Sequence, residues 1–308
     1  MDISEKRYRS LSAYLKERFG EKVFKVSLNA GFTCPNIDGT KGRGGCTFCS
    51  PLGSGDFAGN KKDDLYTQFH NIKDMMHKKW PKAKYIAYFQ AFTNTYAPLE
   101  ELKEMYEKFV DYDPNIVAIS IATRPDCLPD DVVEYLGELN TRIPLIVELG
   151  LQTMHEETAN RVNRGHDYET FVEGVEKLRS KNIETVVHII NGLPGETPEM
   201  MLETAKAIAQ LDVQGIKIHM LHVIKHTYMG FQYKKNPFPL LTLEEYIDIV
   251  IRQLEGLPPD MVIHRLTGDA VREHLIAPEW TLKKWVTLNT IDHELKRRNT
   301  YQGRLYKG

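Results

Sequence analysis

The 308-residue sequence has few cysteines, no long apolar segment and no strong excess of one charge. No apolar run approaches the roughly eighteen residues that indicate a membrane-spanning helix, and the N-terminus lacks the apolar core of a secretory signal. We therefore expect a cytoplasmic protein without a membrane partner. The formal net charge of -2 gives no overall attraction for nucleic acid, and nothing predicts DNA binding. Hydrophobic residues at 42% and charged residues at 27% are typical of a globular chain.

Four cysteines in a chain of this length do not indicate a disulfide framework. Three of them, Cys34, Cys46 and Cys49, lie in the glycine-rich stretch "CPNIDGTKGRGGCTFC", with the spacing C-x11-C-x2-C. Clustered thiols in a reducing compartment indicate metal binding or catalysis. Three thiolates can hold three irons of a 4Fe-4S cluster, whereas a closed structural zinc site needs four protein ligands. We favour the cluster, although Cys127 could act as a distant fourth ligand; a packed structural role is the simpler interpretation of that residue.

Apolar segments rich in β-forming residues alternate with amphipathic segments of helical period, which predicts an α/β fold with a parallel sheet. Six such units favour a partial (β/α)6 TIM-like barrel, and the stretch 261–266 reads as one further strand. We expect an N-terminal helix within 1–22, a core barrel over 23–240, and a C-terminal extension over 241–308 that packs on the barrel and ends in a basic tail. The six expected barrel strands span 23–29, 84–90, 116–122, 144–152, 184–190 and 215–223.

The expected strands carry polar residues near their C-terminal ends, where buried parallel strands ought to be apolar. Within a strand the polar residues are two or four positions apart, so they share one face. This pattern predicts a polar ligand at the C-terminal mouth of the barrel. The alternative, in which each group is separately satisfied or exposed, is credible for one residue but less so for a ring. The ring consists of Tyr88, Gln90, Ser120, Glu148, Gln152, His188, Lys217 and His219.

The cysteine loop after the first strand, Phe48 between the last two cysteines, and the parallel barrel together resemble the radical S-adenosylmethionine (radical SAM) superfamily. The long first spacing departs from the superfamily's usual shorter one. It is shared with a smaller bacterial family and resembles the catalytic subunit of the elongator complex. The later segments "SIATRPDCL", "VELGLQTMHEETANRVNRGHD" and "HIINGLPGET" are similar to those of the elongator group and of the oxygen-independent coproporphyrinogen oxidases. The resemblance covers roughly residues 20 to 270.

This resemblance implies a 4Fe-4S cluster held by the three loop cysteines and S-adenosylmethionine bound at its open iron. Gln152 and Arg164 match positions that contact the cofactor, and His188 stands where the oxidases place an acidic ribose ligand. Ala122 replaces an acidic residue of relatives, so we expect Glu148 to supply the missing carboxylate. The further expected cofactor contacts are Phe48, Gln90, Thr93, Ser120 and Leu221. The expected catalytic side chains are Glu148, Lys217 and His219.

The resemblance also implies chemistry on the C5 side chain of a tRNA wobble uridine, trimming or building an aminomethyl group, with flavodoxin or ferredoxin as the electron donor. The tail is compatible with an RNA partner because residues 281–308 hold seven Lys or Arg against two acidic residues, although such a run is usually a solvated face. Two alternatives stay open: a porphyrin-like small-molecule radical SAM oxidase, and a non-catalytic zinc-binding RNA or protein adaptor. The basic residues are Lys283, Lys284, Lys296, Arg297, Arg298, Arg304 and Lys307.

Overall fold

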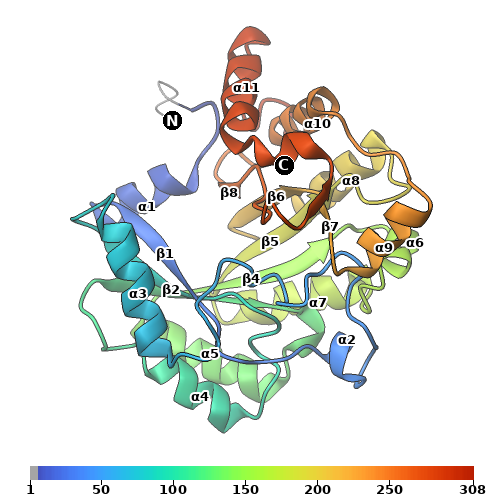
Figure 1. The fold of residues 1–308 in the computed structure, drawn as a ribbon. Coiled ribbons are helices and arrows are strands. Elements are labelled where there is room, and N and C mark those ends of the chain that lie inside the picture. Colours follow the sequence, from blue (N-terminus) through green and yellow to red (C-terminus); the bar gives the residue numbers. More distant parts are fainter. Residues whose placement is uncertain (1–5) are drawn as a thin grey trace.

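The computed structural model describes residues 6–308 and contains a curved sheet of seven parallel strands (Figure 1). The strands follow the order β1-β2-β3-β4-β5-β6-β8, which is their order along the chain, with β7 left out. Within the described part, β1 and β8 are the two edges and do not pair with each other. The predicted partial α/β barrel is therefore confirmed. The strands are β1 (Val23–Leu28), β2 (Lys84–Phe89), β3 (Ile116–Thr123), β4 (Leu145–Gln152), β5 (Glu184–Asn191), β6 (Gly215–Met220) and β8 (Val262–Arg265).

Helices connect successive strands and cover the outer face of the sheet (Figure 1). Side-chain caps start several of them where the sequence predicts: Asp167 accepts from the Thr170 amide, and Thr242 forms a capping box with Glu245. The outer and terminal helices are α3 (Leu65–His77), α4 (Leu99–Glu107), α5 (Asp130–Arg142), α6 (Glu156–Arg161), α7 (Tyr168–Ser180), α8 (Pro198–Ile208), α10 (Leu243–Gly256) and α11 (Lys284–Arg297). Shorter elements are α2 (Pro35–Asp38), α9 (Tyr228–Lys235), the 3-10 turns η1 (Pro125–Cys127) and η2 (Glu279–Leu282), and the ribbon of β7 (Val223–Ile224) with β9 (Leu275–Ala277).

Strand β4 shows how the sheet separates an apolar outer layer from a polar interior. Every second residue from Leu145 to Leu151 packs in the main core beneath the outer helices, whereas Ile146 and Glu148 face inward. Ile146 joins a small apolar cluster at the N-terminal ends of the strands, together with Leu15 of α1 (Leu11–Phe19). Helix α1 thus closes that end of the barrel, and the polar residues above this plug face the other end. Residues 1–5 of the expected N-terminal helix lie outside the described residues.

The C-terminal part of the chain is fastened to the barrel through buried amides. Gln253 of α10 and Asn191 at the end of β5 exchange hydrogen bonds of 2.8 and 2.9 Å, and Gln253 also donates to the carbonyl of Met201 at 3.0 Å. Both amides are almost fully buried, so each hydrogen bond replaces one to water. No helix in the described residues is both long and apolar enough to cross a bilayer.

Replacing Gln253 with Leu should therefore destabilise the fold. The change leaves the buried amide of Asn191 and the Met201 carbonyl without partners, at a cost of about 1–3 kcal/mol for each unpaired group. Urea unfolding followed by circular dichroism measures the difference. Arg252→Ala, on the exposed side of the same helix, is the matched control and should change stability by less than about 0.5 kcal/mol. Equal stability of Gln253→Leu and wild type would contradict the role of this amide pair.

Candidate active site

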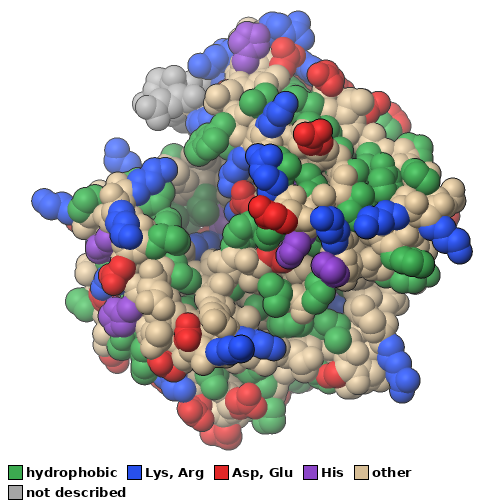
Figure 2. Space-filling model, in the orientation of Figure 1, with side chains coloured by type: hydrophobic (Ala, Val, Ile, Leu, Met, Phe, Trp, Pro, Cys, Tyr) green, Lys and Arg blue, Asp and Glu red, His purple; other side chains and the backbone are tan. Residues whose placement is uncertain are grey.

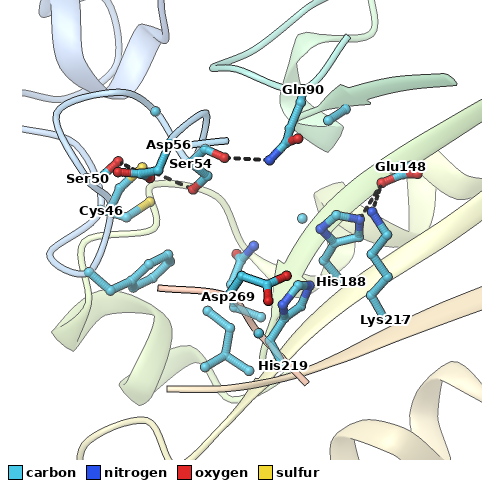
Figure 3. Close-up of a pocket in the computed structure, with 18 of the residues that line it drawn as sticks. Cys46, Ser50, Ser54, Asp56, Gln90, Glu148, His188, Lys217, His219 and Asp269 are labelled. Carbon is cyan, nitrogen blue, oxygen red and sulfur yellow. Dashed lines mark hydrogen bonds and ion pairs between the residues drawn. The ribbon is translucent and has the colours of Figure 1, made fainter. Parts of the chain in front are cut away.

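A cavity of about 800 Å³ occupies the barrel interior at the C-terminal ends of the strands. The cysteine loop forms one wall, and side chains of β4, β5 and β6 form the opposite floor (Figure 3). In the space-filling view the centre of the molecule is hollowed between the N-terminal helices and the C-terminal part (Figure 2). Ligand sites of enzymes commonly have volumes of about 300–1,000 Å³, so the cavity has room for a cofactor with part of a substrate.

The three loop cysteines all line this cavity. Their loop is fixed by its own backbone: the Gly45 amide donates to the Asn36 carbonyl at 2.8 Å, and the Cys49 amide donates to the Cys46 carbonyl at 3.0 Å. A further hydrogen bond of 2.9 Å from the Thr47 amide to the Val162 carbonyl ties the loop to the end of α6. The loop is therefore held in place by the barrel rather than hanging free in solvent.

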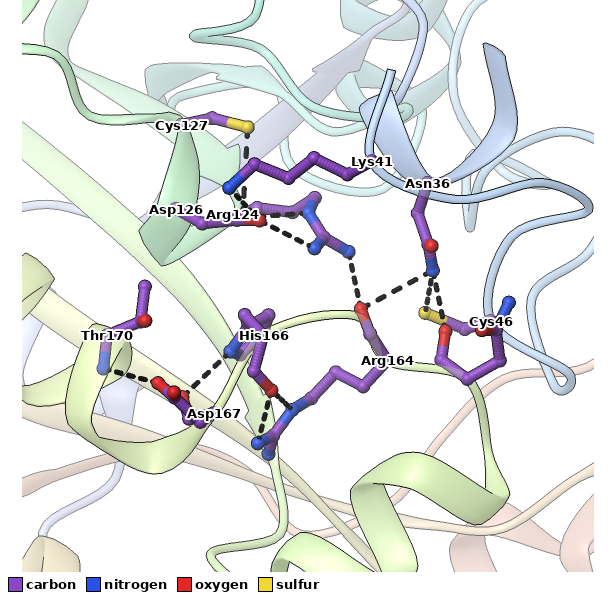
Figure 4. Close-up of polar contacts among 11 residues, drawn as sticks. Asn36, Lys41, Cys46, Arg124, Asp126, Cys127, Arg164, His166, Asp167 and Thr170 are labelled. Atoms are coloured by element: carbon purple, nitrogen blue, oxygen red, sulfur yellow. Dashed lines mark hydrogen bonds and ion pairs between the residues drawn. The ribbon is translucent and has the colours of Figure 1, made fainter. Parts of the chain in front are cut away.

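Asn36 is the side chain that locks the loop beside Cys46 (Figure 4). Its amide donates to the Asn163 carbonyl at 2.6 Å and to the Cys46 sulfur at 3.7 Å. A Cβ atom at Gly42 would lie 2.1 Å from the Asn36 side-chain oxygen, so a larger residue there would displace the Asn36 amide. The loop glycines thus serve close packing as well as turning, which the sequence alone does not distinguish.

The pKa values of two loop thiols indicate that their thiolate forms require a bound cation. Burial raises the pKa of Cys46, and burial together with the neighbouring Cys46 raises the pKa of Cys49 to about 12. The thiolate forms thus need a nearby cationic centre, which bound iron provides. In residues 6–308, no three His, Cys, Asp or Glu side chains converge closely enough to hold a single metal ion. A cubane distributes its thiolates over separate irons, so its ligands lie farther apart.

Cys127 lies apart from this cavity wall. Its thiol is buried in η1, 3.8 Å from a carboxylate oxygen of Asp126, and it does not line the cavity (Figure 4). Burial and the neighbouring carboxylate raise its pKa to about 12. Its surroundings are those of a packed structural cysteine.

Glu148 is the centre of the cavity floor. Its two carboxylate oxygens accept from Tyr88 at 2.9 Å, Ser120 at 3.0 Å and His188 at 2.8 Å. The ammonium groups of Lys25 and Lys217 complete the set as ion pairs. These five groups come from five other strands, β1, β2, β3, β5 and β6, so one carboxylate connects six of the seven strands.

The charges of this network have defined directions. Burial alone would raise the pKa of Glu148, but the two lysines and the His188 ring hold it well below its usual range. Burial, partly offset by Glu148, lowers the pKa of Lys217 to about 7. Burial and the adjacent Lys217 lower the pKa of His188 to about 4, so this ring is neutral near pH 7. The floor therefore holds one carboxylate against two lysines, one of which titrates near neutrality.

Three further histidines bring unpaired ring nitrogens to the same region. Among the described residues, the Nε2 atoms of His219 and His222 and both ring nitrogens of His264 are buried without a hydrogen-bond partner. Burial lowers the pKa of all three, so they are neutral near pH 7. Since buried polar atoms are normally paired, these nitrogens are available to a bound ligand.

Gln152 is held in an unusual backbone conformation at the end of β4. Its φ of 62° lies in the left-handed region that glutamine seldom adopts, and the pairing of β4 with β5 shifts register beside it. Such strain persists where the surrounding fold imposes it and is frequent at functional sites. Gln152 lines the cavity together with Gln90, whose amide donates to the Ser54 carbonyl at 2.8 Å (Figure 3).

Arg164, for which we expect a cofactor contact, is engaged by the protein backbone in this structure. Its side chain is buried and donates to backbone carbonyls: Nη1 to Leu151 at 2.6 Å and to Thr153, and Nε and Nη2 to His166 at 2.9 and 2.7 Å. All three guanidinium nitrogens are thus occupied by the protein. The geometry makes Arg164 a brace between the end of β4 and the turn before α7, because backbone carbonyls on both sides lie within its reach.

The structure gathers nearly all the other expected site residues around the cavity. Ser120 is the exception, since it lies beneath the surface and donates to Glu148. Sequence reasoning missed Lys25, although a lysine within an apolar strand is a usable signal, and it missed the β8 side, where Arg265 pairs with Asp269 at 2.8 Å. The expected residues that line the cavity are Cys34, Cys46, Cys49, Phe48, Gln90, Thr93, Glu148, Gln152, Arg164, His188, Lys217, His219 and Leu221.

The basic tail differs from a row of free cations. Arg297 pairs with Glu294 at 2.7 Å, and Arg298 pairs with both Glu294 and Asp248. Lys284 pairs with Asp269 at the cavity rim. Helical spacing in α11 brings Glu294 to both arginines, as expected for a solvated helix face, whereas Asp248 and Asp269 come from other segments. Much of the positive charge counted in the sequence is therefore balanced locally.

Comparison with known proteins gives matches over nearly the whole chain. Residues 37–208 match the family described as the radical SAM superfamily, and residues 213–297 match the radical SAM C-terminal domain. The chain is 58% identical to YtqA of Bacillus subtilis strain 168, covering 99% of this chain and 94% of the relative. It is 36% identical to YhcC of Escherichia coli K12, covering 91% and 90%.

More distant matches lie in proteins that this chain only partly spans. It is 28% identical to a tRNA uridine(34) acetyltransferase of Methanocaldococcus jannaschii, covering 56% of this chain and 31% of the relative. The structure of Methanocaldococcus infernus Elp3 lacking residues 1–46 superposes with a TM-score of 0.70 at 17% identity, covering 91% of this chain and 64% of that one. Escherichia coli coproporphyrinogen III oxidase, titled a radical SAM enzyme, gives a TM-score of 0.50 at 18% identity, covering 80% and 52%.

Each loop cysteine should be needed to hold iron. After anaerobic reconstitution the wild type should contain about four irons per chain, whereas Cys34→Ala, Cys46→Ala and Cys49→Ala should lose the cluster absorbance because each removes one ligand. Cys127→Ala is the matched control and should keep its iron, since that thiol lies outside the cavity. Iron and sulfide analysis measures the outcome. A normal iron content in a loop variant, or an equal loss in Cys127→Ala, would contradict this ligand set.

Glu148 should contribute to stability in a pH-dependent way. Glu148→Gln leaves two buried lysines without their counter-charge, which should cost about 3–5 kcal/mol at neutral pH. Because the folded-state pKa of Glu148 is depressed, its contribution is fully present above pH 4.5 and is lost as pH falls through the folded pKa. Urea unfolding of wild type and variant at a series of pH values should show that their difference in unfolding free energy becomes smaller as the pH falls. Exposed Glu173→Gln is the control, and a difference independent of pH would refute the interpretation.

Proposed function

The chain belongs to the radical SAM superfamily, and from this premise we propose that it modifies the C5 side chain of a wobble uridine in tRNA. The chain is an enzyme, as its family indicates. Members of the family use a 4Fe-4S cluster and S-adenosylmethionine, which when bound supply a 5′-deoxyadenosyl radical by one-electron cleavage of the sulfonium. The protein's task is to hold these groups, exclude water and present the substrate C–H bond.

The residues present fit both cofactors. Cys34, Cys46 and Cys49 would hold the cluster because they converge on one cavity wall from a loop fixed to the barrel. The strained Gln152 and the neutral His188 would meet the polar groups of S-adenosylmethionine, and Phe48 offers an apolar contact from the same loop. Arg164 would act indirectly by fixing the turn that follows β4.

The charged cavity floor is the observation that carries the substrate proposal. The bottom of the pocket is formed by Lys25, Glu148 and Lys217. An apolar substrate group there would remove water from these charges without offering a hydrogen bond in return. A polar substituent on a flat base suits this arrangement, with the unpaired His219 nitrogen as a hydrogen-bonding partner. Lys217 and His219 are also the groups that could move a proton there, because Lys217 titrates near neutrality.

Recognition of tRNA would require the target base to leave its stack. A base in the single-stranded anticodon loop can be extruded at low cost and read in a snug pocket. The similarity to tRNA uridine(34) acetyltransferase and to Elp3 supports this substrate, although the chain spans only about a third of the former. We place the enzyme in the cytoplasm, with a flavodoxin or ferredoxin as electron donor, because tRNA and such carriers occur together there.

A strain lacking the gene should show an altered wobble nucleoside in its total tRNA. Complementation with the wild-type gene should restore the pattern, whereas complementation with Cys46→Ala should not, because the variant lacks one cluster ligand. Mass spectrometry of tRNA nucleosides measures both. Cys127→Ala is the control and should restore the pattern. Unchanged nucleosides in the deletion strain would reject the tRNA substrate and favour the small-molecule alternative, while 5′-deoxyadenosine release would still report the family's chemistry.

A further inference from the structure

A second concave site lies on the outside of the cysteine loop. It encloses about 430 Å³ and is lined by Thr47, Arg161, Tyr228, Phe231 and Lys235, among others. Thr47 stands between two of the loop cysteines, and its carbonyl accepts a hydrogen bond of 2.8 Å from the Met229 amide of α9. This outer site and the main cavity therefore face opposite sides of the same stretch of chain.

Apolar packing seals the two sites from each other. Phe48, Val162, Leu221 and Met229 belong to one hydrophobic cluster between the cavity and α9. No residue lines both cavities. A molecule bound on the outside thus cannot reach a substrate in the barrel. Only the cysteine loop itself separates such a molecule from the thiols.

The outer site has the composition of a docking surface. Tyr228 and Phe231 are 61% and 66% exposed and lie three residues apart on α9, so they form one exposed aromatic patch. The sequence has no Asp or Glu from residue 218 to residue 243, whereas Lys225, Lys234 and Lys235 lie there. Across residues 6–308, no carboxylate lies within ion-pair distance of these three lysines. Figure 2 shows hydrophobic and basic side chains together over the region of α9.

We propose that this α9 surface, formed by Tyr228, Phe231, Lys234 and Lys235 beside Thr47, docks an acidic one-electron carrier of the flavodoxin or ferredoxin class. The carrier's reduced centre loses one electron and is oxidised, and the iron–sulfur centre that the loop would hold gains that electron and is reduced. No bond forms or breaks and no proton is required. The proposal rests on the family's need for an electron and not on the tRNA substrate.

Location and charge favour this occupant. Electron transfer becomes rapidly slower with distance, so the reductant must approach the loop closely, and the cavity side would be taken up by cofactor and substrate. Small electron carriers have acidic surfaces, and their complexes are small and steered by charge. An apolar centre of two aromatics with lysines beside it matches such an interface. Exposed aromatics with lysines would also suit unpaired RNA bases, but a base bound here is sealed from the cavity.

The test measures binding of purified oxidised flavodoxin, and separately ferredoxin, to the reconstituted full-length protein by calorimetry at low and moderate salt. The variant Lys234→Glu/Lys235→Glu should weaken binding at least tenfold at low salt and flatten its salt dependence, since steering depends on these charges. The variant Phe231→Ser should weaken binding but keep the salt dependence. The matched control is Lys78→Glu/Lys79→Glu, an exposed lysine pair at the end of α3, which should bind as wild type does.

Cluster reduction provides a second readout. We compare the rate of cluster reduction by reduced flavodoxin with the rate by dithionite. This ratio should fall in Lys234→Glu/Lys235→Glu and stay at the wild-type value in Lys78→Glu/Lys79→Glu. Equal weakening in both charge variants, or no carrier binding by the wild type, would overturn the proposal. A loss of tRNA binding without loss of carrier binding would overturn it too and would assign the surface to RNA. Because carrier binding and cluster reduction are measured without tRNA, failure of the tRNA proposal leaves these two readouts intact.

Discussion

The buried carboxylate of Glu148 is the constraint on which the barrel interior depends. It receives side chains from five other strands, and its two oxygens are fully used by them. A buried carboxylate is costly unless it is paired and hydrogen-bonded, so the stability of the Glu148 network depends on all its members together. Removing a lysine or the carboxylate leaves a buried charge uncompensated, and removing a hydrogen-bond donor leaves a carboxylate oxygen short of a partner, so the network couples the register of all six strands. The edge strands β1 and β8 do not pair, so the barrel is open on that side. The Glu148 network in the interior holds the strands together instead.

This arrangement divides the interior into three levels along the strands. Apolar side chains and α1 close the lower end, the Glu148 network forms the middle, and the cysteine loop covers the upper end. The alternation within β4 makes the division unavoidable, because Ile146, Glu148, Gly150 and Gln152 follow one another on the inward face. Gly150 has no side chain, and a Cβ there would come within 2.6 Å of the Gln152 amide. The small residue thus leaves room for Gln152 to reach into the cavity.

The sequence pattern was sufficient for the strands, the helix caps and the gathering of polar residues at one end, because each depends on local periodicity. It was insufficient where tertiary pairing decides the outcome. The pattern does not show that Arg164, an expected cofactor contact, also donates to nearby backbone carbonyls. The count of basic and acidic residues in the tail does not show that Arg297 and Arg298 pair with acidic residues one helix turn away and on α10. The pattern does not identify Lys25 as a site residue, because the residues of one strand do not show which carboxylate on another strand pairs with it.

The cysteine loop has two faces with different requirements. Its inner face must bring three thiols to one wall, while its outer face must remain covered so that water does not enter behind them. Helix α9 meets the second need by packing Met229 against the loop, and this leaves Tyr228 and Phe231 exposed, since a short helix cannot bury all its aromatic residues. The covering element therefore offers its outer surface to another molecule. Access from outside and exclusion of water from the cavity are compatible because the same apolar cluster separates them.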